Sequence, residues 1–345
     1  MDVHKSVQNY YGKVLNNSSD LKTSACCIAD AMPKHLRSIL SEISDEVKDK
    51  FYGCGSPLPF VLEGQTVLDL GCGTGRDCFM AAKLVGPKGR VIGVDMTPEQ
   101  LEVANRNVNY HTDRFGYKTP NVEFHCGQIE DLKSIDIASE SVDIVISNCV
   151  INLSPNKEDV FKEIFRVLKP GGELYFSDVF TDRRLKKELT TDPVLVGECL
   201  GGAQYFEDFR RLMNGVDNFD FRYMSNTLMT LNNEEISKKC GNVKFYSSTV
   251  RAFKLDLEDR SEDFGQTATY LGTIRDSEDS FRLDDHHLFE KNKTVPVCGN
   301  TAKMLRNSRY GKHFKIIGDE SEHFGIFDCK DDGLQVETNS DQTCC

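Results

Sequence analysis

The chain has 345 residues, 39% hydrophobic and 28% charged, a composition that suits one or two globular domains of ordinary core size. Its formal net charge of −12 argues against non-specific binding of nucleic acids or anionic membranes, since either would need a basic surface. The N-terminus has no continuous apolar core of the secretory kind, and no stretch is long enough to span a bilayer. We therefore expect a soluble intracellular protein, with neither nucleic acid nor membrane as a partner.

The chain contains 13 cysteines. A disulfide scaffold is not expected, because the chain is long and lacks a signal peptide. An excess of cysteines in an intracellular protein indicates soft-metal binding or redox catalysis, or it reflects small apolar residues in the core. For any single cysteine, burial in the core is the default interpretation.

Residues 1–60 are predicted to form helices followed by a loop. Apolar side chains from Val3 to Val14 fall on one helical face, and a second helix is expected to begin after Pro33. Two glycines and two prolines then break "FYGCGSPLPF" into a loop that carries Cys54.

Residues 65–180 alternate between strand-like and helical segments. "TVLDL", "RVIGVD", "NVEFHCG", "VDIVISN" and "ELYFSDVF" read as strands, and helices are expected between them, one of them from Thr97 to about Phe115. Because these strands are apolar and rich in β-branched residues, the alternation predicts an α/β fold, a mostly parallel sheet with helices on both faces.

The pattern loosens after residue 180. Residues 181–257 combine two helical and two strand-like segments, which indicates a smaller α+β region. We expect an acidic, polar linker over 258–280, a short C-terminal module over 281–328 and a disordered tail over 329–345. The string "DDHH" at 284–287 could bind a metal, but we interpret it as a solvated loop.

The first chemical motif is "VLDLGCGTG" at 67–75. Its glycines let the backbone turn sharply off a strand and approach a ligand closely, because they lack Cβ. Such a motif alone is weak evidence, since a nucleotide-binding dehydrogenase would carry something similar. It gains support from Asp95, which ends the next strand, where a carboxylate can accept hydrogen bonds from both ribose hydroxyls.

Together with "RVLKPGGELYFSD", this motif resembles the class I S-adenosylmethionine-dependent methyltransferases. The resemblance implies a Rossmann-like cofactor domain over 61–180. It implies that Gly71 and Gly73 line the methionine part of S-adenosylmethionine, that Asp95 binds the ribose, and that Met96 packs on the adenine. Further cofactor contacts are implied for Tyr52, Asp69, Ile129, Glu130 and Asn148.

The methyl acceptor needs a nucleophile in line with the methyl group, and oxygen or nitrogen acceptors usually need a general base. None of the eight histidines lies in an obvious motif beside the cofactor. Cysteines do occur at suitable places, since Cys54 precedes the first strand, Cys149 follows the strand "VDIVISN", and Cys199 lies in "GECLGG". Three such thiolates could converge on one site and would select a soft, thiophilic centre.

The longer strings "FYGCG", "GRDC", "IGVDMT", "SNCVINL", "GGELYFSDV", "GECLGG" and "LRNSRYGKHF" resemble arsenite methyltransferases of the animal type, over roughly residues 5–325. The resemblance implies that Cys54, Cys149 and Cys199 bind trivalent arsenic, and that Cys26, or the adjacent Cys27, matches the family's N-terminal cysteine. It also implies a cytosolic enzyme, with thioredoxin or glutathione as reductant and an arsenic–thiol complex as substrate. We expect a monomer.

The chain departs from the family pattern in several places. It has no tryptophan, and Val196 and Phe206 stand where the family usually carries one. The 181–257 region, which the resemblance makes the arsenic-binding region, is therefore expected to differ in local packing. The terminal Cys344 and Cys345 resemble a variable cysteine-rich tail, to which we assign no catalytic role.

The implied mechanism needs no protein base, because trivalent arsenic keeps a lone pair that attacks the methyl carbon. Cys149 and Cys199, helped by Cys54, would take over the ligands of arsenic as thiolates. Cys26 and Cys54 are the candidates for a disulfide that returns arsenic to the trivalent state and is reset by an external dithiol. The products would be methylated and dimethylated arsenicals.

Two other functions remain open from the residues alone. A carbon methyltransferase of the quinone-biosynthesis type shares "VLDLGCGTG" and "RVLKPGG" but would be indifferent to replacement of Cys54, Cys149 and Cys199. A thiolate-based protein that binds arsenic or zinc would use the fold as a scaffold and would not bind S-adenosylmethionine. The glycine motif and Asp95 argue against the binding protein.

Overall fold

The structure, a computed structural model, describes residues 4, 7–8, 10–14, 32–53 and 55–328. Cys26, Cys27, Cys54 and the expected tail at 329–345 lie outside the described residues. Within the described part of the chain, no helix is long and apolar enough to cross a membrane.

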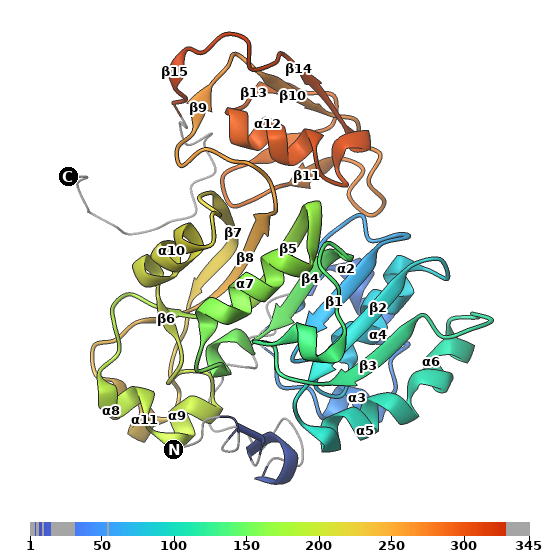
Figure 1. Ribbon diagram of the computed structural model, residues 1–345, viewed down its shortest axis with the longest axis vertical. Helices are drawn as coiled ribbons and strands as arrows, with labels where there is room; N and C mark the ends of the chain where they lie inside the picture. Colours follow the sequence, from blue (N-terminus) through green and yellow to red (C-terminus); the bar gives the residue numbers. More distant parts are fainter. Residues whose placement is uncertain (1–3, 5–6, 9, 15–31, 54, 329–345) are drawn as a thin grey trace.

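An eight-stranded sheet forms the centre of the molecule (Figure 1), with the order β3-β2-β1-β4-β5-β8-β7 and with β6 paired to β5. Its strands are β1 Thr66–Leu70, β2 Arg90–Asp95, β3 Val122–Cys126, β4 Val142–Asn148, β5 Leu168–Thr181, β6 Gln204–Tyr205, β7 Phe221–Leu228 and β8 Phe245–Phe253. The pairs from β3 to β6 are parallel, while β8 runs antiparallel to both β5 and β7. The expected mostly parallel α/β sheet is confirmed.

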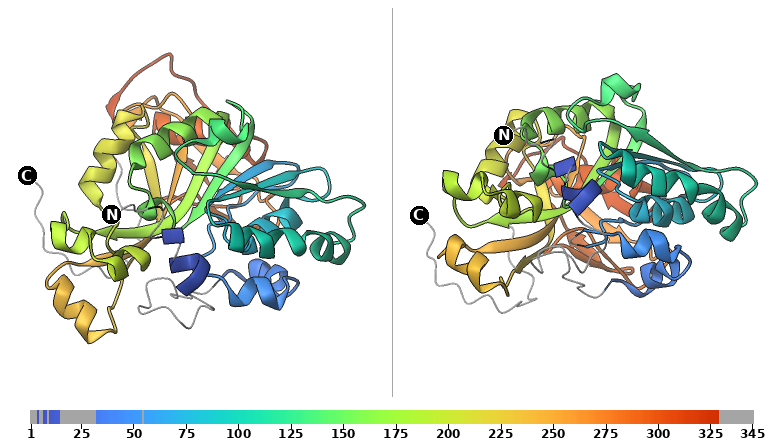
Figure 2. Two further views of the ribbon diagram at one scale, coloured as in Figure 1. Left: turned by 60° about the horizontal axis from the view of Figure 1, so that its bottom comes forward. Right: turned by 90° about the horizontal axis from the view of Figure 1, so that it is seen from below.

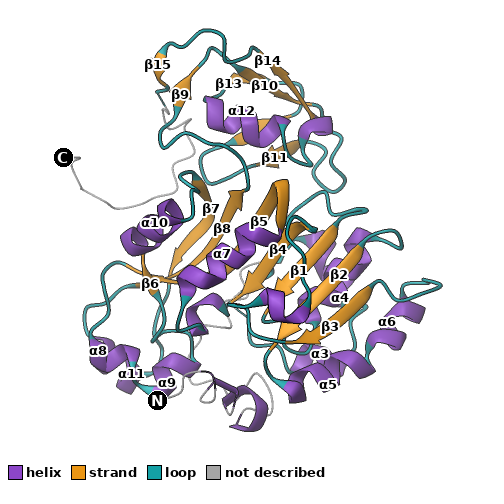
Figure 3. Ribbon diagram, in the orientation of Figure 1, coloured by secondary structure: helices purple, strands orange, loops and turns teal. Residues whose placement is uncertain are grey.

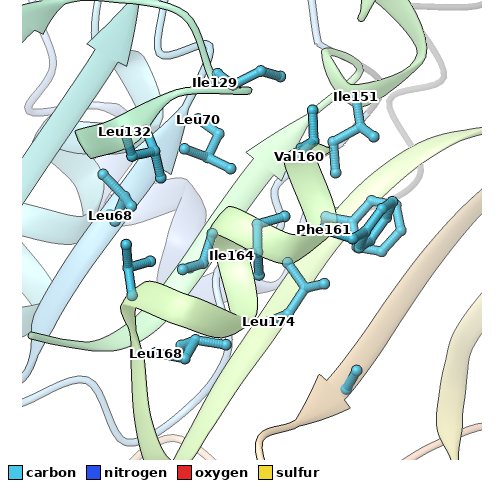
Figure 4. Packing of buried hydrophobic residues seen from close by; sticks show 14 of the residues in the cluster. Leu68, Leu70, Ile129, Leu132, Ile151, Val160, Phe161, Ile164, Leu168 and Leu174 are labelled. Atoms are coloured by element: carbon cyan, nitrogen blue, oxygen red, sulfur yellow. The ribbon is translucent and has the colours of Figure 1, made fainter. Parts of the chain in front are cut away.

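Helices cover both faces of this sheet (Figure 3), as the alternating pattern predicts. On one face, α7 Lys157–Val167 packs on Leu68 and Leu70 of β1 through side chains such as Phe161 and Ile164, as Figure 4 shows in part. On the same face, α10 Phe206–Gly215 packs on β5 and β7 through Phe209. On the other face, α2 Lys34–Leu40, α3 Asp45–Asp49, α4 Arg76–Val85 and α5 Pro98–Arg106 pack on strand residues that include Val67. Successive residues of β1 thus serve opposite layers, as side-chain alternation along a strand requires.

The remaining helices are short. They are the π-helix η1 Tyr10–Val14, the α-helices α6 Val108–Arg114, α8 Lys187–Thr190, α9 Pro193–Gly197, α11 Glu234–Cys240 and α12 Gly299–Arg306, and the 3₁₀-helices η3 Leu132–Ile135, η4 Ile151–Leu153 and η5 Gly311–His313. The single helix expected from Thr97 to Phe115 is two helices, because the chain leaves helical hydrogen bonding at Asn107.

Residues 181–257 do not form a separate sheet. Their two strand-like segments become β7 and β8, and β8 pairs with β5 along nine residues from Phe245 to Phe253. The region expected to bind arsenic is therefore an extension of the cofactor sheet rather than a unit beside it.

The linker expected over 258–280 is wrong. Residues 262–270 contain β9 Glu262–Asp263 and β10 Thr267–Tyr270, and β10 pairs with both β13 Thr294–Pro296 and β14 Phe314–Ile317. The other C-terminal strands are β11 Ser280–Arg282, β12 Leu288–Glu290 and β15 Gly325–Ile326. The C-terminal module therefore begins before residue 281, and its central strand comes from the segment read as a linker.

The C-terminal module packs on the end of the sheet opposite the N-terminal segment (Figure 1). A buried ion cluster joins the two parts: Glu173 of β5 accepts a hydrogen bond from Arg251 Nε at 2.7 Å and pairs with Arg309, and Tyr310 donates to it at 3.3 Å. Glu173 is fully buried, so its charge depends on these partners.

Candidate active site

A cavity opens at the carboxyl ends of β1, β2 and β4, where open α/β sheets bind ligands. It contains about 940 Å³ of space, including its mouth, and every described residue proposed above to contact the cofactor lines it. Those residues are Tyr52, Asp69, Gly71, Gly73, Asp95, Met96, Ile129, Glu130 and Asn148. Cys149 lines the same cavity.

The glycine loop approaches its surroundings so closely that side chains are excluded. Gly71 has φ +71°, and a Cβ there would lie 2.3 Å from Cγ1 of Val150. Gly73 has φ +52°, and its backbone N–H donates to Oδ2 of Asp95 at 2.9 Å. The loop is thus fixed to the end of β2 and presents bare backbone to the cavity.

Asp95 lies at the end of β2 and is 9% exposed. Its Oδ1 accepts the Thr97 N–H at 2.8 Å, and the Gly73 bond holds Oδ2. Burial raises the pKa of Asp95, although these backbone hydrogen bonds oppose the shift. A polyol such as ribose would supply the hydrogen bonds that this carboxylate can still accept.

The floor of the cavity is acidic. Burial, reinforced by the nearby Asp77 charge, raises the pKa of Asp69 to about 8, while a hydrogen bond from the Cys78 thiol at 3.2 Å acts against the rise. Asp77 pairs with Arg76 at 2.7 Å and accepts from the Asn148 amide at 2.8 Å. A cationic ligand group would therefore lie near two carboxyl groups, those of Asp69 and Asp77. Asp77 is not among the cofactor contacts predicted from the sequence.

His4, Val7 and Tyr11 of the N-terminal segment line one side of the cavity. Figure 2 shows the helix η1 of this segment, in dark blue, in front of the sheet when the molecule is seen from below. His4 Nε2 lies 3.0 Å from Oε1 of Glu130, which also accepts from Ser154 Oγ at 2.6 Å. Gln8 donates to the Met96 carbonyl at 2.5 Å, and the carbonyl of Tyr11 accepts from Gln100 at 2.9 Å. The apolar helical face of this segment indicates that it packs against another part of the protein, but the sequence pattern does not identify that part as the cofactor cavity.

Cys149 and Cys199 come together although 50 residues separate them, since the Cys199 thiol donates to the Cys149 carbonyl at 3.0 Å. Both are buried and both have left-handed backbone, with φ +56° at Cys149 and φ +62° at Cys199. Non-glycine residues rarely adopt this conformation, and where they do the strain often marks a functional site. The backbone here brings the Cys199 thiol to the backbone of Cys149, which lines the cofactor cavity.

The glycines of "GECLGG" allow this approach. A Cβ at Gly202 would lie 1.9 Å from the Asn152 carbonyl oxygen, so only glycine fits between the two loops. Tyr11 donates to the Gly197 carbonyl at 2.7 Å and lies 3.9 Å from the Cys199 sulfur. The loop that carries Cys199 therefore touches both the Cys149 segment and the N-terminal segment.

Cys149 is disulfide-bonded in this structure. Among the other described cysteines, the free ones include Cys72, Cys78, Cys126, Cys240 and Cys298. The structure thus describes an oxidised Cys149 rather than a thiolate.

The string "DDHH" is only in part the solvated loop that was expected, since Asp285 and His286 are exposed. Asp284 is buried, pairs with Arg222 at 2.9 Å and lies 2.8 Å from Nδ1 of His287. Within the described ranges, no group of three or more His, Cys, Asp or Glu residues could hold a metal ion.

Comparison with known proteins identifies the family. A methyltransferase-domain family matches residues 62–235, and the arsenite methyltransferase C-terminal domain family matches residues 264–340. The chain is 51% identical over 348 aligned positions to an arsenite methyltransferase of Aquipseudomonas alcaligenes, covering 99% of this chain and 100% of the relative. The chain belongs to the arsenite methyltransferase family.

Other members of the arsenite methyltransferase family agree with this assignment. The human arsenite methyltransferase is 42% identical over 316 positions, which cover 91% of this chain and 84% of the human protein. The solved arsenic(III) S-adenosylmethionine methyltransferase of Chlamydomonas reinhardtii is 49% identical, with a TM-score of 0.84 over 86% of this chain and 100% of that one. The class I methyltransferase fold is thereby shown.

The positions without tryptophan retain aromatic or apolar packing. Phe206 stacks on Phe180 with ring centroids 5.4 Å apart and lies 5.3 Å from the Tyr246 ring. Val196 packs against the buried hydrophobic cluster that contains Cys149 and Cys199. A Cβ at Gly201 would lie 2.8 Å from Cγ2 of Val196.

Proposed function

We propose that this chain transfers methyl groups from S-adenosylmethionine to trivalent arsenic held by cysteine thiolates, giving methylated and dimethylated arsenicals. The observation that carries the proposal is the contact of the Cys199 thiol with the Cys149 carbonyl, since Cys149 lines the cofactor cavity. Family membership supports the reaction class, and the geometry supports these two residues as arsenic ligands.

The cavity residues fit S-adenosylmethionine. When bound, this cofactor supplies an electrophilic methyl group. Gly71 and Gly73 leave room for its methionine part, Asp95 would bind the ribose hydroxyls, and Asp69 and Asp77 would face its positive charges. Met96 and Ile129 would pack on the adenine, with Glu130 nearby.

On the acceptor side, the substrate is arsenite or methylarsenite delivered as a thiol adduct. Cys149 and Cys199, helped by Cys54, take over its ligands by exchange, which requires that Cys149 first be reduced. The lone pair of trivalent arsenic then attacks the methyl carbon, so no protein group has to remove a proton. This accounts for a cavity whose one described histidine, His4, is paired with Glu130.

Methyl transfer oxidises arsenic formally by two electrons, and conversion of two protein thiols to a disulfide returns them. We assign this step to Cys26 and Cys54, with thioredoxin or glutathione as the external reductant in the cytosol. The protein is proposed to act as a monomer.

Replacement of Cys149 tests the proposal. We expect Cys149→Ser to lower methylation of arsenite by at least about a hundredfold in the presence of a dithiol, because a hydroxyl is a poor ligand for a soft centre. Cys126→Ser is the matched control, since Cys126 is exposed and free and should tolerate the change. Full activity of Cys149→Ser, measured by mass spectrometry of the products, would overturn the proposal.

A further inference from the structure

A second cavity lies beside the loop that carries Cys199, and neither the cofactor nor the cysteines account for it. It shares Leu153 and Ser154 with the cofactor cavity, so the segment that follows Cys149 forms the wall between the two. Its polar lining comes from Asn152, Ser154, Lys157, Arg184, Thr190, Gln204, Tyr205 and Asp208.

The cavity adjoins the proposed arsenic site. Val196 and Gly201, which flank Cys199 in the chain, both line it. Asn152, another lining residue, contacts the same loop through the close approach of Gly202 to its carbonyl. The second cavity therefore lies against the loop that carries Cys199 and against the segment that follows Cys149.

The charge of the cavity favours an anion. The Lys157 ammonium donates to the carbonyls of Asn152 at 3.2 Å and Ser154 at 3.0 Å, and no described carboxylate forms an ion pair with it. Two carboxyl groups, those of Asp178 and Glu130, act on the charge of Lys157. Both already have hydrogen-bond partners: Asp178 accepts from the backbone N–H groups of Asn152 and Val179, and Glu130 accepts from Ser154 and lies 3.0 Å from His4.

At the rim, Arg184 forms a two-point ion pair with Asp208, with both N–O distances 2.6 Å. Asp208 also accepts from Arg211 at 2.9 Å, so its charge is shared between two guanidinium groups. The described lining thus carries two cations and one carboxylate, on a chain whose net charge is −12. Such a local excess of positive charge marks an anion site.

We propose that this cavity binds the carboxylate-bearing part of a small anionic thiol that carries arsenic to Cys149 and Cys199. The inference rests on the proposed function and names a binding site for its carrier. Lys157 pairs with a carrier carboxylate, Arg184 attracts it at the rim, and Thr190, Gln204 and Tyr205 offer hydrogen bonds to peptide-like amides.

The transfer is an exchange without oxidation. One arsenic–sulfur bond to the carrier breaks, one to a protein cysteine forms, and the carrier leaves as a thiol with the proton of that cysteine. Retention of the carrier by its carboxylate would keep it beside the arsenic during the first exchange, which raises the effective concentration of the reacting groups.

The test compares glutathione with its diethyl ester as the carrier of arsenite, because the ester keeps the thiol and removes the carboxylates. We expect Lys157→Gln to raise KM for arsenite about tenfold with glutathione and to leave KM with the ester unchanged. Lys157→Arg should restore the preference. Lys162→Gln, on an exposed position of the same helix, is the matched control.

The proposed carrier site would be overturned if Lys157→Gln changed KM for arsenite equally with glutathione and with its ester, or changed it with neither. Arg184→Gln, at an exposed side chain, gives a second variant that does not depend on the buried contacts of Lys157, and it should shift KM in the same selective way. Failure of the wild-type protein to methylate arsenite with either carrier would instead overturn the proposed function.

Discussion

The two halves of the active site use left-handed backbone in opposite ways. On the cofactor side the residues with positive φ are Gly71 and Gly73, whereas on the acceptor side they are Cys149 and Cys199. An L-residue in this conformation costs about 1–2 kcal/mol, and glycine does not bear that cost. Under the proposed function, the cofactor half relies on close approach of the backbone, while the acceptor half keeps a strained backbone in order to place two cysteine side chains.

The largest expected effect concerns the buried acid on the cofactor side. The pKa of Asp69 in the folded protein is about 8, above its ordinary 3.8, so folding favours the protonated form. Its stabilising contribution is complete below about pH 4 and is lost as pH rises through 8, with a slope of about 1 kcal/mol per pH unit.

Asp69→Asn should remove this dependence from the ligand-free protein. The measurement is the free energy of unfolding by urea at several pH values, and the difference between variant and wild type isolates the Asp69 contribution. Asp113→Asn, at an exposed position, should leave the profile unchanged. Parallel profiles for wild type and Asp69→Asn would contradict the buried-acid interpretation.

Gly71→Ala tests whether cofactor binding requires the close approach of the Gly71 backbone to Val150. A Cβ at this position clashes with Val150, so we expect the affinity for S-adenosylhomocysteine to fall by at least about a hundredfold in calorimetric titration. Gly116→Ala is a matched control, because Gly116 has φ +75° but nothing within 4 Å of its Cβ position. If Gly71→Ala binds S-adenosylhomocysteine as well as Gly116→Ala does, close approach at Gly71 is not what the cofactor half requires.

The smallest effect tests the strain on the acceptor side. With a reductant present, Cys199→Gly should be more stable than Cys199→Ala by about 1 kcal/mol, because glycine relieves the left-handed backbone. Cys240 is buried in helix α11, where the order should reverse by about 0.5–1 kcal/mol in favour of alanine. The same order at both positions in urea unfolding would argue against strain at Cys199.

The sequence predicted best what short-range patterns determine. The glycine motif and the acid at the end of β2 were assigned correctly to one cavity, because parallel strands bring their carboxyl ends to one edge of the sheet. The pairing of His4 with Glu130 joins residues 126 positions apart, and no local pattern carries such a contact.

Composition is a poor guide to structure where short strands carry charged neighbours. Residues 258–280 look like a linker because acidic and polar residues dominate, yet Ala268 and Tyr270 are fully buried on β10. Asp284 was read as solvated for the same reason, whereas Arg222, 62 positions earlier, compensates its buried charge. The strands of residues 181–257 were recognised, but the pattern of a strand does not say which sheet it joins.

Strand β5 links the module to the chemistry. One end holds Glu173 in the buried ion cluster, and four residues further on the Ser177 carbonyl accepts the Cys149 N–H at 2.8 Å. A shortened protein that ends at residue 257 would keep Arg251 but lose Arg309 and Tyr310, leaving the Glu173 carboxylate with one partner instead of three. For engineering, the domain boundary suggested by the family matches is therefore not a place to cut, because the strand that aligns Cys149 is anchored on the far side of it.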